Sequence, residues 1–283
     1  MMDAVSTHLR PKEYKSGVKP VWCPGCGDFG VLNAITKALS ALTLAPERVA
    51  VVSGIGCSSR LPAYLSAYGF HGVHGRALPF ATGLAVARPE LSVLAVGGDG
   101  DGFSIGGNHF IHACRRNVPF TYVVMDNAVY GMTKGQASPT TEGDWTGSGL
   151  TPTGTHVNAF RPLEMALSAG AGYIARGFSG DPNNLARLIA EGMEHPGFAF
   201  IQVLSPCITY RPEQMEYKHR VHDGFQVTSD RREAFVQLLD DDGFAQGLLY
   251  RAAASGWHPD SATETDLEAI AEGFRVGGGE GES

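Results

Sequence analysis

The sequence of 283 residues lacks both a long hydrophobic run and a surplus of positive charge. No apolar stretch reaches the ~20 residues that a transmembrane helix needs, and the N-terminus, MMDAVSTHLRPKEYK, has no apolar segment like that of a signal peptide. Lys and Arg number 22 against 29 Asp and Glu, and no basic stripe suggests a nucleic-acid surface. We therefore expect a cytoplasmic protein that binds neither membranes nor nucleic acids.

The acidic excess is confined to one part of the chain. Residues 1–207 carry 15 Lys and Arg against 14 Asp and Glu, whereas residues 208–283 carry 7 against 15. Such an acidic stretch is usually a solvated surface, and we expect that here.

Cysteine is also scarce. The five cysteines are an odd number in a chain without a signal peptide, which makes a disulfide framework unexpected. Metal binding, catalysis or core packing remain as their roles.

The remaining pattern is that of an α/β protein. Apolar runs expected to form strands, at 49–52, 120–125, 172–175 and 198–204 and before the GDGDG motif, alternate with helical patterns at 29–41, 77–87, 107–116, 161–169 and 182–193. This alternation predicts a doubly wound, mostly parallel sheet covered by helices on both faces.

Three regions are expected along the chain. Residues 1–27 read as an N-terminal arm that carries a CxxC turn, residues 28–207 as the α/β domain, and residues 208–283 as an irregular extension. The extension is expected to contain one helix, Arg231 to Leu239, and a disordered end, GGGEGES. The polar loop at 135–156 is long enough to be a functional lid or to be ordered by a partner.

Several segments rich in glycine and polar residues follow the predicted strands directly. In a parallel sheet these segments share the carboxyl edge, where ligands bind. They are Gly54–Arg60, Gly97–Asp101, Asp126–Gly131 and Ser205–Cys207.

The segments after two neighbouring strands carry a candidate diphosphate and Mg²⁺ site. Asp99 lies in GDGDG, and Asn127 follows 28 residues later at the end of the next strand. Carboxylate and amide oxygens suit a hard cation, and glycines let the backbone approach a ligand closely. A Rossmann nucleotide site fits less well because no GxGxxG joins a first strand to its helix. Two unrelated glycine-rich turns remain the plain alternative.

Four cysteines could meet at the same edge. Cys23 and Cys26 form the CxxC turn, and Cys57 and Cys207 each follow a strand. Zinc and a [4Fe–4S] cluster both accept four cysteines, but structural zinc sites usually draw on two local pairs, so a cluster fits better. The alternative is a CxxC turn with two unrelated core cysteines. Cys114 is expected to pack in the hydrophobic core.

Two histidines and two loop residues are weaker candidates. His109 and His112 lack a third metal ligand nearby and indicate a helix surface or core position. Lys134 and Gln136 could touch a cofactor or partner, and a solvated lid explains them equally well.

Six blocks in order resemble the β subunit of the 2-oxoacid:ferredoxin oxidoreductases, especially the two-subunit 2-oxoglutarate type. They are WCPGCGDFG, GIGCSSR, HGRALPFATG, GGDGDGFSIGGNH, DNAVYGMTKGQASPT and SPC. The resemblance covers about residues 15–225 and implies the thiamine diphosphate-binding fold.

The resemblance implies a CoA-dependent oxidative decarboxylation of a 2-oxoacid to an acyl-CoA and CO₂. Thiamine diphosphate, Mg²⁺ and one [4Fe–4S] cluster would serve it, with electrons leaving singly to ferredoxin. Pyruvate is the alternative substrate. A non-catalytic metal-binding subunit with a degenerate thiamine fold is the alternative from another class.

Matching positions imply roles for individual residues. The implied Mg²⁺ ligands are Asp99, Asn127 and the carbonyl of Val129. The implied cluster ligands are Cys23, Cys26, Cys57 and Cys207. Residues implied to line the cofactor, besides the Mg²⁺ ligands, are Ile55, Gly56, Cys57, Ser58, His74, Gly98, Gly100, Asp101, Gly131, Met132 and Thr133. His74, Met132 and Arg60 are implied to be catalytic, and Met132 would hold the cofactor bent. Arg60 stands where related chains often carry Lys near the reacting carbon, so substrate carboxylate binding is retained and a Lys-specific role is in doubt.

One group that the family mechanism needs is missing. A glutamate must contact the aminopyrimidine of the cofactor, but before Asn127 the only glutamates are Glu13, Glu47 and Glu90. Glu47 and Glu90 precede strands, at the wrong end of the sheet, and Glu13 is in the arm. We therefore expect an α subunit to supply the glutamate and much of the CoA site, in an α2β2 complex.

Overall fold

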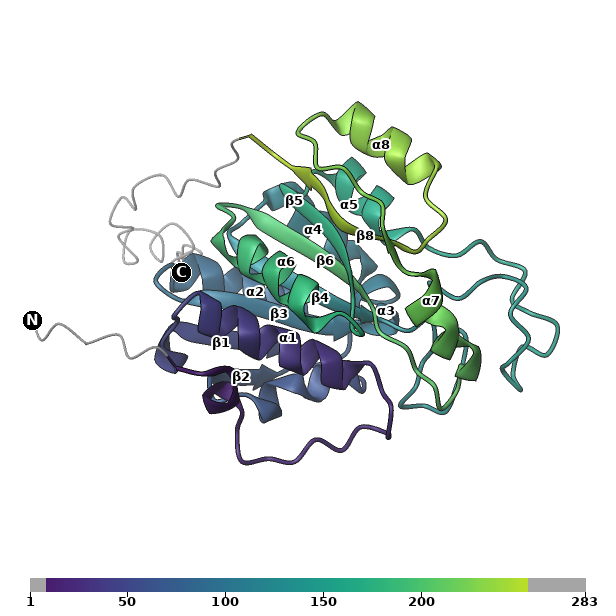
Figure 1. Cartoon of the computed structure of the whole chain (residues 1–283), viewed down its shortest axis with the longest axis horizontal. Helices are drawn as coiled ribbons and strands as arrows, with labels where there is room; N and C mark the ends of the chain where they lie inside the picture. Colours follow the sequence, from purple (N-terminus) through teal and green to yellow (C-terminus); the bar gives the residue numbers. More distant parts are fainter. Residues whose placement is uncertain (1–8, 254–283) are drawn as a thin grey trace, which may run out of the picture.

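The computed structural model describes residues 9–253, and within them eight strands form one sheet (Figure 1). The strand order is β2-β1-β3-β4-β6-β5-β8-β7, and neighbours are parallel except β5 and β8. The strands are β1 (Val49–Ser53), β2 (Tyr68–His71), β3 (Ser92–Gly98), β4 (Phe120–Asp126), β5 (Tyr173–Phe178), β6 (Phe198–Leu204), β7 (His222–Asp223) and β8 (Ala245–Arg251).

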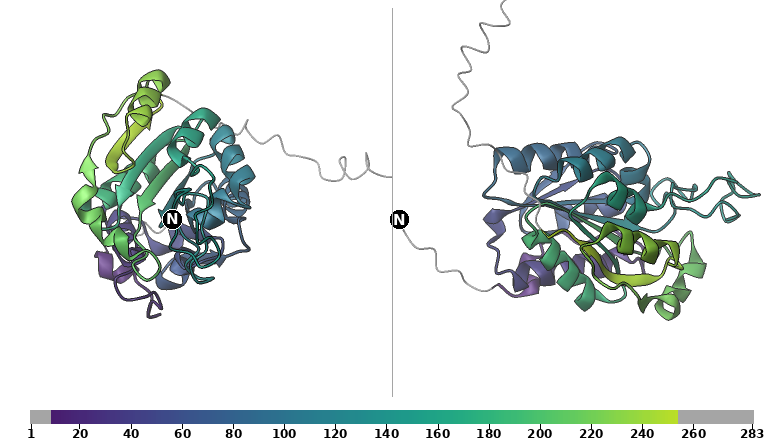
Figure 2. Two further views of the ribbon diagram at one scale, coloured as in Figure 1. Left: turned by 90° about the vertical axis from the view of Figure 1, so that its right-hand side faces the viewer. Right: turned by 90° about the horizontal axis from the view of Figure 1, so that it is seen from above.

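Helices cover both faces of the sheet (Figure 2). One face carries α1 (Asp28–Ala41) and α6 (Pro182–Glu194), and the other carries α2 (Ala77–Ala87), α4 (Gly107–Arg116) and α5 (Pro162–Ala169), with α8 (Arg231–Leu239) packed on α5. The shorter helices are η1 (Pro11–Tyr14), η2 (Pro46–Arg48), η3 (Ser58–Tyr64), α3 (Asp99–Phe103), η4 (Pro212–Glu216) and α7 (Tyr217–Arg220).

The central strands are mostly apolar and buried along their whole length because both of their faces are covered. Every residue of β1, β4 and β6 is buried. Successive side chains point to opposite faces, so β4 sends Val123 and Met125 towards α1 and α6, and Tyr122 and Val124 towards α2, α4 and α5. Two hydrophobic cores result, one on each side of the sheet.

The predicted fold class, an α/β fold with a doubly wound and mostly parallel sheet, is confirmed. The helices predicted at 107–116, 161–169 and 182–193 lie within a residue or two of α4, α5 and α6. The helix predicted at 231–239 is α8, and the loop at 135–156 has no regular secondary structure. The predicted disordered end, GGGEGES, lies outside the described residues.

Two details differ from the prediction. The sequence suggests Asp28 as the cap of the helix expected at 29–41, but Asp28 is the first residue of α1, and its buried carboxylate accepts a hydrogen bond from the Ser205 hydroxyl at 2.8 Å. The sequence also gave no sign of β2, β7 or β8, and β8 extends the main sheet alongside β5.

The strand order places a crevice where ligands bind in such sheets. The chain leaves β1 outward to β2, whereas it leaves β3 in the other direction to β4, so β1 and β3 flank the switch point. The loops after β1, β3 and β4 meet at the carboxyl edge of this crevice. No helix among the described residues is long and apolar enough to cross a membrane.

Candidate active site at the carboxyl edge of the sheet

A cavity of about 90 Å³ lies where β1, β3 and β4 end. The structure brings all fourteen residues predicted to surround the cofactor into its lining, and Tyr130 joins them. The lining is Ile55, Gly56, Cys57, Ser58, His74, Gly98, Asp99, Gly100, Asp101, Asn127, Val129, Tyr130, Gly131, Met132 and Thr133.

Asp99 begins α3 directly after β3 and is 1% exposed. Its Oδ2 accepts hydrogen bonds from the hydroxyls of Ser138 and of Thr140, the latter at 2.9 Å. The Thr140 hydroxyl also lies 2.7 Å from Oδ1 of Asp126, a second buried carboxyl. Burial, together with the charge of Asp126, raises the pKa of Asp99 to about 7. A divalent cation here would favour the ionised form of Asp99 and relieve the repulsion between the two carboxylates.

The turn after β4 presents Asn127 and the backbone of Val129. Ala128 has φ 53°, a left-handed conformation that is unusual for a residue with a Cβ. The turn is fixed by a 3.1 Å bond from the Val129 N–H to Asn127 Oδ1. The Ala128 carbonyl accepts from the Thr141 hydroxyl at 2.7 Å and from Arg211 at 3.2 Å. These bonds stabilise the strained turn, in which Asn127 and Val129 line the cavity.

Asp101 connects the loops after β1 and β2. Its Oδ1 accepts from the N–H groups of Ile55 at 2.8 Å and Gly75 at 2.7 Å, and it lies 2.9 Å from His74 Nδ1. Asp101 is only 3% exposed. Its bonds to the two backbone N–H groups fix the wall of the cavity. Besides lining the cavity, as predicted, Asp101 therefore holds two loops together.

Glycine is needed at position 100 by the close approach of an aromatic ring. A Cβ on Gly100 would lie 2.2 Å from Cε1 of Tyr130, whose hydroxyl donates to the Gly100 carbonyl at 3.2 Å. Any side chain here would displace Tyr130 and open the cavity wall.

The four predicted cluster ligands line a second cavity of about 160 Å³ beside the first. Cys23, Cys26, Cys57 and Cys207 are all free of disulfides. A Cβ on Gly131 would lie 3.7 Å from the sulfurs of both Cys57 and Cys207, so the cofactor loop touches the cysteine loops.

Among residues 9–253, no three His, Cys, Asp or Glu side chains are grouped as they would be around a single metal ion, the four cysteines included. A [4Fe–4S] cluster binds each thiolate to a different iron, so its ligands stand further apart around a larger space. Burial raises the pKa of Cys57 to about 11 and also raises the pKa of Cys26 and Cys207, so these thiols need a bound metal to ionise near neutral pH.

The remaining predicted residues lie around these two cavities. Met132 lines both cavities and is 48% exposed. Arg60 lines only the cysteine cavity, where its Nε is 3.4 Å from the Tyr64 hydroxyl. His109 and His112 belong to no metal-binding group in the described part of the chain, and Cys114 is buried in the core.

No glutamate lines either cavity. Glu47 belongs to η2 before β1, and Glu90 precedes β3 and pairs with Arg88, so both lie at the opposite end of the sheet. Glu13 pairs with Arg10 at η1.

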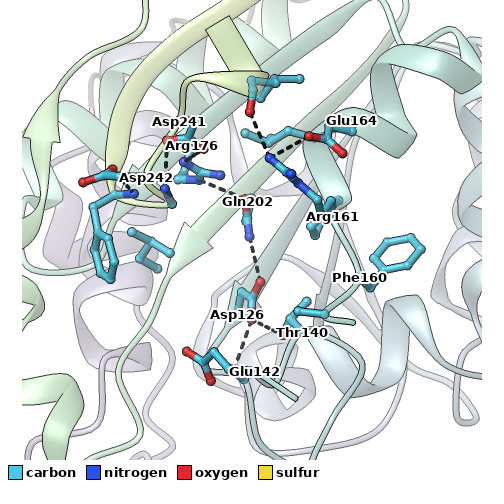
Figure 3. A pocket seen from close by; sticks show the side chains of 18 of the residues that line it. Asp126, Thr140, Glu142, Phe160, Arg161, Glu164, Arg176, Gln202, Asp241 and Asp242 are labelled. Atoms are coloured by element: carbon cyan, nitrogen blue, oxygen red, sulfur yellow. Dashed lines mark hydrogen bonds and ion pairs between the residues drawn. The ribbon is translucent and has the colours of Figure 1, made fainter. Parts of the chain in front are cut away.

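A third cavity, of about 630 Å³, lies beyond Asp126, and Figure 3 shows the polar chain across it. Asp126 Oδ2 accepts from Gln202 at 2.7 Å, and Gln202 accepts from Arg176 at 3.0 Å. Arg176 in turn pairs with Asp241 at 2.7 Å. These bonds tie the end of β4 to β6, β5 and the segment before β8, and so stabilise the start of the Asn127 turn.

Sequence reasoning missed several residues that hold the site. Ser138 and Thr140 belong to the loop at 135–156, whose many hydroxyl groups were the only signal. Arg211 and Gln214, in the segment after Cys207, gave no signal because their roles depend on contacts with a distant turn.

The fold and these cavities define the chain as a protein with the binding domain of thiamine diphosphate enzymes. The family described as "Thiamine pyrophosphate enzyme, C-terminal TPP binding domain" matches residues 54–203. A structure of 2-oxoglutarate:ferredoxin oxidoreductase from Magnetococcus marinus, with 2-oxoglutarate, coenzyme A and succinyl-CoA bound, superposes with a TM-score of 0.84. The sequences are 43% identical, over 95% of this chain and 92% of that one.

Curated relatives show to which family of thiamine diphosphate enzymes the chain belongs. The 2-oxoglutarate oxidoreductase subunit KorB of Mycobacterium tuberculosis is 48% identical over 69% of this chain and 52% of its own length. The 2-oxoglutarate synthase subunit KorB of Methanocaldococcus jannaschii is 47% identical over 67% of this chain and 70% of its own. The chain belongs to the β subunits of the 2-oxoacid:ferredoxin oxidoreductases, which confirms the resemblance seen in the sequence. It spans only about half the length of the M. tuberculosis relative.

Proposed function

We propose that this chain, with an α subunit, oxidatively decarboxylates a 2-oxoacid, with 2-oxoglutarate preferred, and transfers the acyl group to CoA. One observation carries the proposal: the candidate diphosphate cavity and the four-cysteine cavity share a wall. Both are lined by Cys57, Asn127, Gly131 and Met132. An organic redox centre and an iron–sulfur cluster placed on either side of one loop can exchange electrons directly. The M. marinus structure, in which 2-oxoglutarate, coenzyme A and succinyl-CoA are bound, supports 2-oxoglutarate and CoA as the substrates.

In this proposal Asp99, Asn127 and the Val129 carbonyl hold Mg²⁺, and the glycine-rich turns let the backbone approach the diphosphate. The raised pKa of Asp99 and the strained turn at Ala128 fit this cation. Bound thiamine diphosphate supplies the nucleophilic carbon and the electron sink for decarboxylation, and a [4Fe–4S] cluster accepts the electrons singly for transfer to ferredoxin.

The residues of this chain orient the cofactor and the substrate and exclude water. Met132, which lines both cavities, would hold the cofactor bent and shield it from water, while the Arg60 cation would attract the substrate carboxylate. Cys23, Cys26, Cys57 and Cys207 provide the cluster thiolates.

The site in this chain is half of a complete one. No glutamate lines the diphosphate cavity. The glutamate that contacts the aminopyrimidine, and the pocket around that ring, therefore belong to the α subunit, as does much of the CoA site, in an α2β2 assembly.

The test is anaerobic purification of the chain with and without its α subunit. The complex should be brown, contain about four iron atoms per β subunit, and reduce ferredoxin or a viologen dye when given 2-oxoglutarate and CoA. Pyruvate should give a lower kcat/KM, and the β chain alone should be inactive. A colourless complex with stoichiometric zinc, or robust activity of the β chain alone, would contradict the proposal.

A further inference from the structure

One buried side chain connects the two cavities. Gln214, in η4, is 1% exposed and lies seven residues after Cys207. Its Nε2 donates to the backbone carbonyl of Asn127 at 2.7 Å, and its Oε1 accepts from the backbone N–H of Cys207 at 2.8 Å. Both ends of one carboxamide are therefore bonded, each to the backbone of a different candidate metal ligand.

The chemistry at this position is specific to an amide. The carbonyl of Asn127 requires a donor and the N–H of Cys207 requires an acceptor, and glutamine offers both in one rigid plane. An ionised glutamate offers only acceptors, and methionine replaces neither bond. Each unmatched partner would remain buried without a hydrogen bond.

The surrounding contacts hold Gln214 in place. The Gln214 N–H donates to the Arg211 carbonyl at 3.0 Å, and Arg211 itself donates to the carbonyl of Ala128, next to Asn127. The segment at 207–216 thus contacts two successive carbonyl groups of the turn after β4. The turn and the Cys207 loop are joined as one unit, although the two are about eighty residues apart in sequence.

We infer that Gln214 is a positioning residue that fixes the iron–sulfur cluster relative to the thiamine diphosphate. This inference rests on the proposed function, since it assigns the two cofactors to the two cavities. A second consequence follows from the same bond. The Cys207 N–H, because it is held by Gln214, is unavailable to donate to a cluster sulfur, and such donors raise the reduction potential of a cluster.

The experiment compares the α/β complex carrying Gln214→Met with the complex carrying Gln237→Met. Gln237 is a matched control in α8, where its amide makes the same pair of bonds, both at 2.8 Å, to the backbone of Gln226. Gln214→Met should shift the midpoint potential of the cluster to a more positive value and change its EPR spectrum. Reduction of the cluster in a single turnover should slow by about tenfold, because misplaced reacting groups lose rate steeply with distance. Gln237→Met should match the wild type in all three measurements.

Hydrogen exchange tests the link without relying on the cofactors. In the β chain, Gln214→Met should speed exchange in both 126–131 and 205–211, whereas Gln237→Met should change neither. Gln214→Glu, which keeps the shape and the acceptor for Cys207, should speed exchange mainly in 126–131, and it serves if the methionine variant does not fold.

The outcomes separate the two ideas. An unchanged potential and reduction rate in Gln214→Met, or faster exchange in only one of the two segments, would overturn the role of Gln214 and leave the proposed function intact. A wild-type complex without iron would overturn the proposed function itself.

Discussion

At the scale of single residues, the site depends on polar groups shared between buried partners. Thr140 contacts two carboxyls, Asp99 and Asp126, and Gln214 contacts two backbone groups. Such groups orient the residues that would touch a cofactor without touching it themselves. The sequence predicted Asp99 and Asn127 because their types and spacing are local signals. It could not predict Thr140 or Gln214, because a hydroxyl or an amide gives no indication of which distant group it will contact.

Thr140→Val removes the shared hydroxyl at nearly constant volume. The affinity of the complex for Mg²⁺ and thiamine diphosphate should fall about 10–100-fold, as it does when partners of metal ligands are removed elsewhere. Titration of cofactor binding by tryptophan fluorescence or calorimetry measures it. Thr82→Val is the control, because the Thr82 hydroxyl only bonds the Leu78 carbonyl of its own helix at 2.8 Å. Equal affinities in the two variants would contradict the role of Thr140.

His195, after α6, should make stability depend on pH. Burial lowers the pKa of this imidazole to about 4, from about 6.5 in the unfolded chain. The unfolded state therefore binds a proton first as the pH falls, so the stabilisation is complete above about 6.5 and is lost between about 6.5 and 4. In urea titrations at several pH values, the free energy of unfolding of His195→Gln should change by ~1–3 kcal/mol less over this range than that of the wild type. Parallel curves for variant and wild type would show that His195 titrates normally.

At the scale of helices and strands, the sequence predicts those elements whose hydrophobic pattern is visible over a short stretch of the chain. Helices α1, α4 and α6 show one apolar face each, and β4 and β6 are predominantly apolar runs, so all were predicted. β2 was missed because its four residues are all exposed and show no alternation. β8 was missed because Gly247 interrupts it at φ 133°, and because its pairing with β5 joins residues about seventy positions apart.

Helix α1 packs so closely on the loop after β5 that one glycine has no room for a methyl group. A Cβ on Gly30 would lie 2.0 Å from the Ser179 carbonyl oxygen, so Gly30→Ala should destabilise the chain by ~1–3 kcal/mol. Gly83, in α2, has nothing within 4 Å of its Cβ position, so Gly83→Ala should stabilise by ~0.4–1 kcal/mol. Chemical denaturation of the two variants measures both. The same sign of change in both would contradict the packing described.

At the scale of the whole molecule, the predicted site residues lie at one edge of the sheet because topology dictates it, while the loops that complete the cavity were not predictable. The parallel sheet brings the ends of β1, β3, β4 and β6 to one edge, whatever their loops contain. The loop at 135–156 and the segment at 207–216 have no periodic pattern, and their positions depend on a few long-range contacts. Arg211 makes several of these, bonding Glu142 and the Ala128 carbonyl while stacking on Trp145.

Arg211→Ala should therefore loosen both segments together. Because Arg211 is 4% exposed and its acceptors would lose a charged donor, the chain should lose ~1–3 kcal/mol of stability. The loop at 135–156 should become sensitive to limited proteolysis. Arg187→Ala removes a pair with Glu191 on the exposed face of α6 and should cost ~0–0.5 kcal/mol without affecting the loop. Resistance of the loop in Arg211→Ala would indicate that other contacts hold it.

The order of strands in the sheet also determines when the four thiols can come together during synthesis of the chain. The CxxC turn and Cys57 leave the ribosome early, but Cys207 follows β6, which must insert between β4 and β5 before the fourth thiol can reach the others. Parallel strands joined by long crossovers form slowly, and the chain emerges at about 5–20 residues per second. The thiols of Cys23, Cys26 and Cys57 are therefore made some seconds before the thiol of Cys207 can join them. In the proposed function these four thiols bind one cluster, which can therefore be loaded only after most of the chain has been synthesised.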